Sequence, residues 1–341
     1  MKTDITIAEE PFLPRFLHKI YTACRRVYTR LYYSSYNPLV YEKDPNVANE
    51  RIYELLKSGK PCMIARFGAN ELITVFNYLG ITEHRGDAWG YITRKNGPWW
   101  WNETMLWQLE HAAGFFPITD DSVRRFCQLM LKDATEVDIL GSWLKEETAI
   151  TDLLKNAYKV ALPYLEPWFA EAPWSKALEG KKVLVIHSFD ELIKQQYEKR
   201  NHLFSKEILP SFAALYTIKA VQSYGENSKT CGFKSWFDAL QWMEDEMDKL
   251  DYDVCILGCG AYGFPLAAHA KRMGKQAIHL GGVSQVLFGI TGSRWLDPMH
   301  RVKEWNIPEN YYASLANEYW VRPGEATKPS QANQIEGACY W

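Results

Sequence analysis

The chain has 341 residues, of which 47% are hydrophobic and 23% are charged. This is the balance of a globular protein with enough apolar material for a core, and the length allows two domains or one large α/β domain. The formal net charge of −2 gives no indication of a nucleic-acid partner. The seven cysteines include no CxxC pair, which favours free thiols in a reducing compartment over a zinc site. Neither a secretory signal nor an apolar run of transmembrane length is seen, so a cytoplasmic location is expected.

Residues 1–45 are expected to form a helical extension at the N-terminus. Within residues 12–33, apolar side chains recur at helical spacing, at Phe16, Ile20, Val27 and Leu31, with basic residues among them. Such a helix either makes a peripheral contact with an anionic membrane, or packs on the body of the protein with its basic side in water. The second interpretation is favoured because only one short segment carries the signal.

Strand and helix patterns alternate through residues 46–341, which indicates a single domain with about seven strands. The predicted strands are Cys62–Ala65, Val137–Leu140, Val160–Leu162, Val183–Ile186, Tyr216–Val221, Val254–Leu257 and Ala277–Leu280. Helices are predicted between them, Thr151–Tyr158 included. The alternation is typical of an α/β fold with a mostly parallel sheet and helices on both faces. Residues 83–102, rich in charge and tryptophan, predict an ordered loop that covers a ligand or buries a side of the fold. The aromatic-rich C-terminal tail is expected to wrap the core.

Polar side chains follow the first predicted strand. Arg66, Asn70 and Glu71 come after Cys62–Ala65, at the carboxyl end where open α/β sheets build their sites. An arginine there can hold a phosphate through two hydrogen bonds, and a glutamate can act as a base or a metal ligand. Equally, the pair can merely cap the helix that follows.

His187 and Asp190 follow Val183–Ile186 in the same way. The histidine is a candidate phosphate or hydroxyl contact or proton carrier, with a structural histidine as the plainer interpretation.

A glycine-rich turn follows the strand Val254–Leu257. Gly258, Gly260 and Gly263 match GxGxxG and precede a helix, whose free N–H groups suit a phosphate. A dinucleotide site would also need an acid at the end of the next strand, about 20 residues later, where this chain has His279. A phosphate-bearing ligand of another kind is therefore favoured over the alternative, an NAD(P)-dependent oxidoreductase.

Three segments together resemble the GT-D-fold glycosyltransferases, a family first described as a domain of unknown function and found among bacterial surface-glycan genes. They are RFGxxEL at 66–72, VLVIHSF with the later QQYEKR at 183–200, and GCGAYG…AIHLGGVSQVLFGITGSRW at 258–295. The resemblance covers residues 50–300 and the closing segment 336–341.

The resemblance implies a Rossmann-like sheet that binds a nucleoside-diphosphate sugar, UDP-linked by expectation, and transfers the sugar to a glycan or glycoprotein acceptor in surface polysaccharide biosynthesis. It also implies a divalent cation, Mn²⁺ or Mg²⁺, held by an Asp-x-Glu pattern. Glu71 fits that pattern, but Ala69 stands at the Asp position. Either Glu71 works with a carboxylate from elsewhere, such as Asp87 or Asp190, or positive side chains stabilise the diphosphate without a metal.

The expected catalytic base is Glu71, with Asp190 as the second choice. The residues expected to bind the nucleotide sugar are Arg66, Gly68, Asn70, His187, Gly258, Gly260, Gly263, His279, Gly281, Gly282, Gln285 and Arg294. Ala69 leaves a further alternative, a non-catalytic glycan-assembly protein that has kept the fold. A homo-oligomer is also left open, because aromatic-rich surfaces suit both dimers and acceptor sites.

Overall fold

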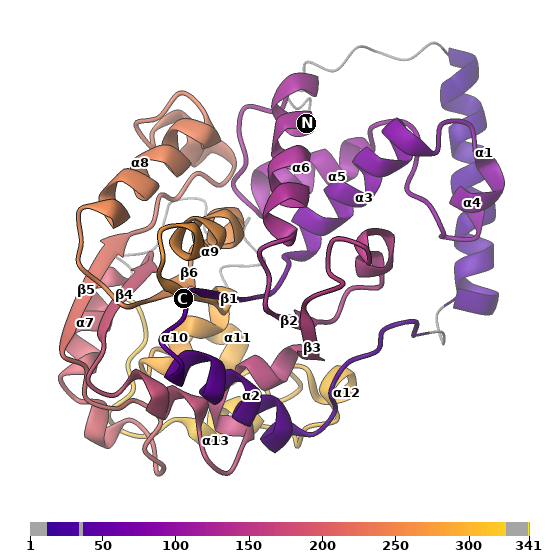
Figure 1. Cartoon of the computed structure of the whole chain (residues 1–341). Coiled ribbons are helices and arrows are strands. Elements are labelled where there is room, and N and C mark those ends of the chain that lie inside the picture. The colour runs from indigo at the N-terminus through magenta and orange to yellow at the C-terminus, as the bar shows by residue number, and fades with distance from the viewer. Residues whose placement is uncertain (1–11, 34–36, 325–339, 341) are drawn as a thin grey trace.

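The computed structural model describes residues 12–33, 37–324 and 340. In these residues seven strands form one sheet, in the order β3-β2-β1-β7-β6-β4-β5, and every neighbouring pair is parallel. The expected α/β, Rossmann-like architecture is therefore confirmed (Figure 1). The strands are β1 (Cys62–Ala65), β2 (Ile139–Ser142), β3 (Tyr158–Ala161), β4 (Lys182–His187), β5 (Ala214–Lys219), β6 (Val254–Gly258) and β7 (Gln276–His279).

Five helices pack on one face of the sheet. They are α3 (Ala69–Glu83), α5 (Glu103–His111), α6 (Asp120–Ala134), α8 (Trp236–Asp248) and α9 (Gly263–Arg272). Side chains alternate between the two faces of a strand. In β1, Met63 and Ala65 point to this face and join a buried cluster that contains Phe126, Trp236 and Leu266. The helix α9 lies against β7, β1 and β6, so it covers the middle of the sheet.

Six further helices cover the other face. They are α2 (Pro45–Lys57), α7 (Asp190–Tyr197), α10 (Ser284–Leu287), α11 (Ser293–Leu296), α12 (Val302–Trp305) and α13 (Tyr311–Leu315). Cys62 and Ile64 of β1 point to this side, where Ile52, Trp174 and Phe288 are buried. With two filled faces the sheet has the continuous apolar strands that parallel sheets require.

The body of the protein begins at α2. The Asp44 side chain accepts hydrogen bonds from the backbone N–H groups of Asn46 at 2.8 Å and Val47 at 3.3 Å, and Pro45 occupies the first turn. A cap of this kind stabilises a helix by about 1 kcal/mol. Buried Ile52 and Leu56 then fix α2 on the sheet.

The predicted N-terminal helix is present. It consists of α1 (Phe12–Tyr28) and a π-helical turn, Thr29–Tyr33. Figure 1 shows α1 at the edge of the molecule, beside α4 (Ala88–Ile92), which lies within the predicted ordered loop. Residues 1–11 of the expected extension lie outside the described residues. No helix in the described part of the chain is long and apolar enough to cross a membrane.

The prediction of a helix at Thr151–Tyr158 is wrong. Residues 151–156 form turns, and β3 already begins at Tyr158. Ile150 and Leu154 are buried, but they span only one helical turn, which is too short to sustain a helix against the pairing of β3 with β2.

The described tail packs on the core as expected, since Tyr312 is buried and Val321 bridges to Ile290. Residues 336–339 and 341 lie outside the described part.

Candidate functional site

The strand register aligns several of the predicted site residues along the carboxyl edge of the sheet. One row of paired residues runs across four strands through Ile64, Ile278, Ile256 and Val185. The residues two positions further along each strand therefore lie side by side at the carboxyl edge, and they are Arg66, Leu280, Gly258 and His187. Segments that are far apart in the sequence meet here because all the strands are parallel.

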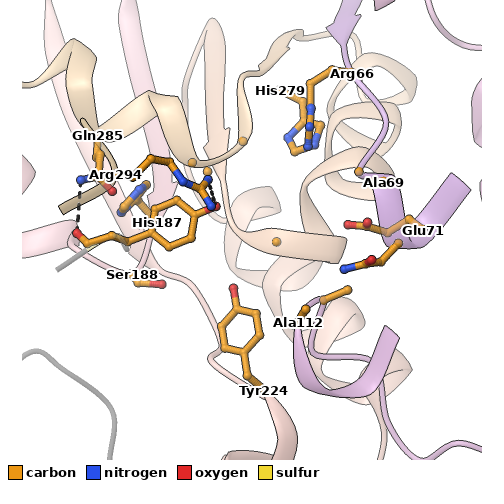
Figure 2. Close-up of a pocket in the computed structure, with 18 of the residues that line it drawn as sticks. Arg66, Ala69, Glu71, Ala112, His187, Ser188, Tyr224, His279, Gln285 and Arg294 are labelled. Carbon is orange, nitrogen blue, oxygen red and sulfur yellow. Dashed lines mark hydrogen bonds between the residues drawn. The ribbon is translucent and has the colours of Figure 1, made fainter. Parts of the chain in front are cut away.

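A pocket of about 200 Å³ opens at this edge (Figure 2). Its lining includes most of the predicted site residues, namely Arg66, Gly68, Ala69, Asn70, Glu71, His187, Gly258, Gly260, His279, Gly281, Gly282, Gln285 and Arg294. Two predicted residues do not line it. Asp190 is the first residue of α7. Gly263 lies beneath the His279 ring, where a Cβ atom would come within 2.3 Å of that ring.

Arg66 lies over the indole of Trp143. Its guanidinium carbon is 4.9 Å from the ring centre, and the indole is oriented by a 3.0 Å hydrogen bond from its N–H to the Phe67 carbonyl. No described residue forms a hydrogen bond with the Arg66 guanidinium. Burial lowers the pKa of Arg66, and the nearby Glu71 opposes that change. The result is a positioned cation whose hydrogen-bond donors face the pocket.

Two further arginines give the pocket a positive character. Arg294 donates a hydrogen bond of 2.8 Å to the hydroxyl of Tyr340 and lies 4.5 Å over that ring. Arg301 lines the same pocket and reaches the Trp143 ring from 5.8 Å. Glu71 is the only carboxylate among the described lining residues. This balance suits a ligand that carries more than one negative charge.

Glu71 is buried at the first turn of α3, with 8% of its surface exposed. Burial raises its pKa, while its own backbone N–H and the charge of Arg66 act in the opposite direction. The carboxylate folds back over Gly68, where a Cβ atom would come within 2.0 Å of Oε2. A side chain at residue 68 would displace the carboxylate, so the glycine leaves room for Glu71 at that place.

The described residues do not form a metal site of three or more ligands. Among the described residues, no three His, Cys, Asp or Glu side chains lie close enough to hold a metal ion together. The two carboxylates considered as partners for Glu71 are both absent from the lining of the pocket. Asp87 caps α4 and accepts a hydrogen bond from Asn96, and Asp190 begins α7.

The two predicted histidines are buried and neutral near neutral pH. Burial lowers the pKa of His187 to about 4, and burial together with the charge of Arg66 lowers that of His279 to about 3. His187 Nδ1 accepts a 3.0 Å hydrogen bond from the Phe189 N–H, which leaves the proton of the neutral ring on Nε2. His187 is thus a hydrogen-bond donor to the pocket rather than a cation.

The glycine turns allow close approach from two sides. Gly260 and Gly281 have φ values of +59° and +68°, which favour glycine. The Tyr224 hydroxyl lies where a side chain on Gly260 would begin, at 2.9 Å from the Cβ position. Figure 2 shows Tyr224 with its hydroxyl toward the middle of the pocket, opposite Arg66 and His279.

Tyr340 closes one side of the pocket. Besides its contact with Arg294, its carbonyl accepts a 3.3 Å hydrogen bond from Gln285, and its ring lies against Gly282. A second cavity of about 80 Å³ shares Tyr340, Arg294 and Arg301 with the first and is lined further by Trp295 and Trp305. The Tyr340 side chain therefore lies at the boundary between two adjoining cavities.

Sequence reasoning missed four residues that shape the pocket: Trp143, Tyr224, Arg301 and Tyr340. Trp143 follows β2 directly, so its place after a predicted strand was a usable signal. Tyr224 follows β5 at a greater distance. No local pattern marks Arg301. Tyr340 lies in the closing segment 336–341 that the family resemblance covers, but the sequence assigns it no role in the site.

Comparison with known proteins finds no matching protein-family model, no matching curated protein and no matching solved structure.

Proposed function

We propose that the protein is a glycosyltransferase that moves a sugar from a nucleoside-diphosphate sugar, UDP-linked by expectation, to a glycan or glycoprotein acceptor. The observation that carries the proposal is Arg66. A half-buried guanidinium, held on an indole and without a hydrogen-bond partner among the described residues, needs an anion to compensate its desolvation. A diphosphate provides that charge, and the oxygens of a phosphate match the fork of an arginine.

The surrounding residues support transfer rather than binding alone. In an inverting transfer, the acceptor hydroxyl attacks the anomeric carbon, the bond from that carbon to the diphosphate oxygen breaks, and the hydroxyl proton passes to a base. We assign the role of base to Glu71, because its raised pKa strengthens it as a proton acceptor. The leaving diphosphate takes the bonding electrons, and Arg66, Arg294 and Arg301 stabilise its growing charge.

The oxidoreductase alternative has less support. In a dinucleotide site an acid at the end of the strand after the glycine turn binds a ribose. Here β7 ends at His279, which is 3% exposed and packed against Gly263, so it offers no carboxylate to a ribose.

The test is a thermal-shift titration with UDP-, GDP- and dTDP-sugars, NAD and NADP, followed by assays for sugar transfer and donor hydrolysis. We expect at least one nucleotide sugar to stabilise the protein and to be turned over. Arg66→Ala should abolish the stabilisation, whereas Arg85→Ala, on an exposed loop before α4, should not.

Three outcomes would contradict the proposal. If no nucleotide sugar stabilises the protein, the proposal is wrong. Stabilisation by NAD or NADP alone would favour the oxidoreductase. Binding of a nucleotide sugar without transfer or hydrolysis would favour a non-catalytic glycan-assembly protein.

A further inference from the structure

Helix α1 turns its polar side, not its apolar side, toward the body of the protein. His18 stacks on Trp100 with ring centres 3.6 Å apart, and Thr22 Oγ1 lies 3.1 Å from the Tyr91 hydroxyl. Arg25 hydrogen-bonds the carbonyls of Tyr91 and Asn96 and stacks on the Tyr91 ring. These contacts fix the rotation of α1 about its own axis.

The opposite side of the helix is apolar and open to solvent. The exposed fractions are 52% for Phe16, 42% for Ile20, 59% for Val27 and 63% for Leu31. Their spacing of four, seven and four residues puts them in one stripe along the helix. The helix packs on the body with basic residues in water, as the favoured interpretation from the sequence has it, but it does so without burying these apolar side chains. The stripe contributes nothing to the core of the described fold.

The charge of the same segment is one-sided. Residues 12–33 contain five arginines and lysines and no aspartate or glutamate. Arg25 faces the body, whereas Lys19, Arg26 and Arg30 are exposed. On a helical projection these three lie along one border of the apolar stripe.

The charges decide between two partners for the stripe. A second copy of the chain, packed stripe against stripe, would bring two rows of like charge together, and residues 12–33 contain no carboxylate to compensate them. An anionic lipid surface offers acyl chains to the stripe and negative headgroups to its basic border, and both contacts are favourable.

From these observations we infer that α1 is an interfacial membrane helix, which lies flat on an anionic bilayer and holds the body of the protein at that surface. Its apolar stripe enters the boundary between headgroups and acyl chains, and Lys19, Arg26 and Arg30 bind the headgroups. The inference does not depend on the proposed enzymatic function, because α1 contributes no residue to the described pocket.

The test is sedimentation of the full chain with vesicles of phosphatidylcholine alone and of phosphatidylcholine mixed equally with phosphatidylglycerol. We expect binding to the anionic vesicles that weakens as salt is added. The double variant Val27→Ser, Leu31→Ser should weaken binding about tenfold or more. Arg26→Gln with Arg30→Gln should weaken it by about tenfold for the anionic vesicles only.

Met273→Ser is the matched control, since Met273 is an apolar side chain of similar exposure, 51%, outside α1. It should leave vesicle binding unchanged, and unfolding temperatures establish that all variants fold. The inference is overturned if the protein binds neither kind of vesicle, or if the Val27→Ser, Leu31→Ser variant binds as well as the wild type. It is equally overturned if the wild type is a dimer that this variant converts to a monomer, because the stripe would then be a contact between copies.

Discussion

Arg66 and Trp143 form a stacked pair in which the indole supports the guanidinium from below and leaves its hydrogen-bond donors to the pocket. The two residues directly follow the neighbouring strands β1 and β2, and the side-chain N–H of Trp143 donates a hydrogen bond to the Phe67 carbonyl. The guanidinium is thus held in place before a ligand arrives, which reduces the entropy that binding has to overcome.

Arg66→Lys should weaken binding of a nucleotide sugar by about 10- to 100-fold. A lysine keeps the charge but loses both the planar stacking on Trp143 and the two-pronged contact with phosphate. Isothermal titration with the nucleoside diphosphate measures the effect. Arg85→Lys is the control, and equal affinities for Arg66→Lys and the wild type would show that Arg66 does not contact the diphosphate.

Glu71→Gln should lower kcat by about 10²- to 10⁴-fold and leave the affinity for the donor nearly unchanged. The wild-type rate should rise with pH through a pKa above the usual glutamate value of 4.5, because burial of Glu71 favours its protonated form. Glu83→Gln, at the exposed far end of α3, provides the control. An unchanged kcat in Glu71→Gln would assign the proton transfer to another group.

Removal of divalent cations with EDTA should leave transfer intact, because three arginines and a single carboxylate line the described pocket. Ala69→Asp provides the complementary test. It places a second carboxylate two residues before Glu71, at the first turn of α3, and should create Mn²⁺ binding that a thermal shift detects. Loss of wild-type transfer in EDTA, restored by Mn²⁺, would refute the metal-free arrangement.

Tyr340→Ala should tighten binding of the nucleoside diphosphate about fivefold. The tyrosine hydroxyl accepts a hydrogen bond from Arg294, and the tyrosine ring fills the space beside Gly282. A ligand that uses that N–H group or that space must therefore first displace Tyr340. Tyr319→Ala, outside the pocket, is the control. Weaker binding by Tyr340→Ala would mean instead that the ring is part of the surface on which the ligand rests.

Glu166→Gln should make the protein more resistant to alkaline unfolding. Burial raises the pKa of Glu166 to about 8 from its usual 4.5, and the Tyr312 hydroxyl donates a 2.7 Å hydrogen bond to its carboxyl group. Since the folded-state pKa is raised, the stabilising contribution is complete below pH 4.5 and is lost as the pH rises through about 8.

The uncharged glutamine accepts the same hydrogen bond at every pH. Unfolding temperatures measured from about pH 5 to about pH 9 should therefore fall less steeply for Glu166→Gln than for the wild type. Glu179→Gln, at an exposed position, should follow the wild type. Parallel curves for Glu166→Gln and the wild type would show that Glu166 is already ionised in the folded protein at the lower pH.

The sequence predicted the sheet well because buried parallel strands are short continuous apolar runs, and glycine turns follow several of them. It also predicted that Arg66, His187 and Gly258 meet, because carboxyl ends of parallel strands share an edge. The sequence did not predict the rotation of α1 about its own axis. Which side of an amphipathic helix faces the body depends on partners such as Tyr91 and Trp100, far along the chain.

The sequence also failed to predict the turns before β3 and the position of Tyr340 in the pocket, for a related reason. Leu154 has the spacing of a helical residue, but the pairing of β3 with β2 determines its surroundings. Tyr340 reaches the pocket through contacts with Arg294 and Gln285, residues about 50 positions earlier, and local propensity contains no information on such contacts.

The central position of β7 has a consequence for how the protein folds. This strand is the last of the seven to be synthesised, yet it separates β1 from β6 and joins the half-sheet β3-β2-β1 to the half-sheet β6-β4-β5. Until Gln276–His279 is inserted, both halves present an unpaired inner edge, and Arg66 and His187 have no common pocket. Ligand binding should therefore report the insertion of β7, and a nucleotide should protect amide hydrogens in both halves at once.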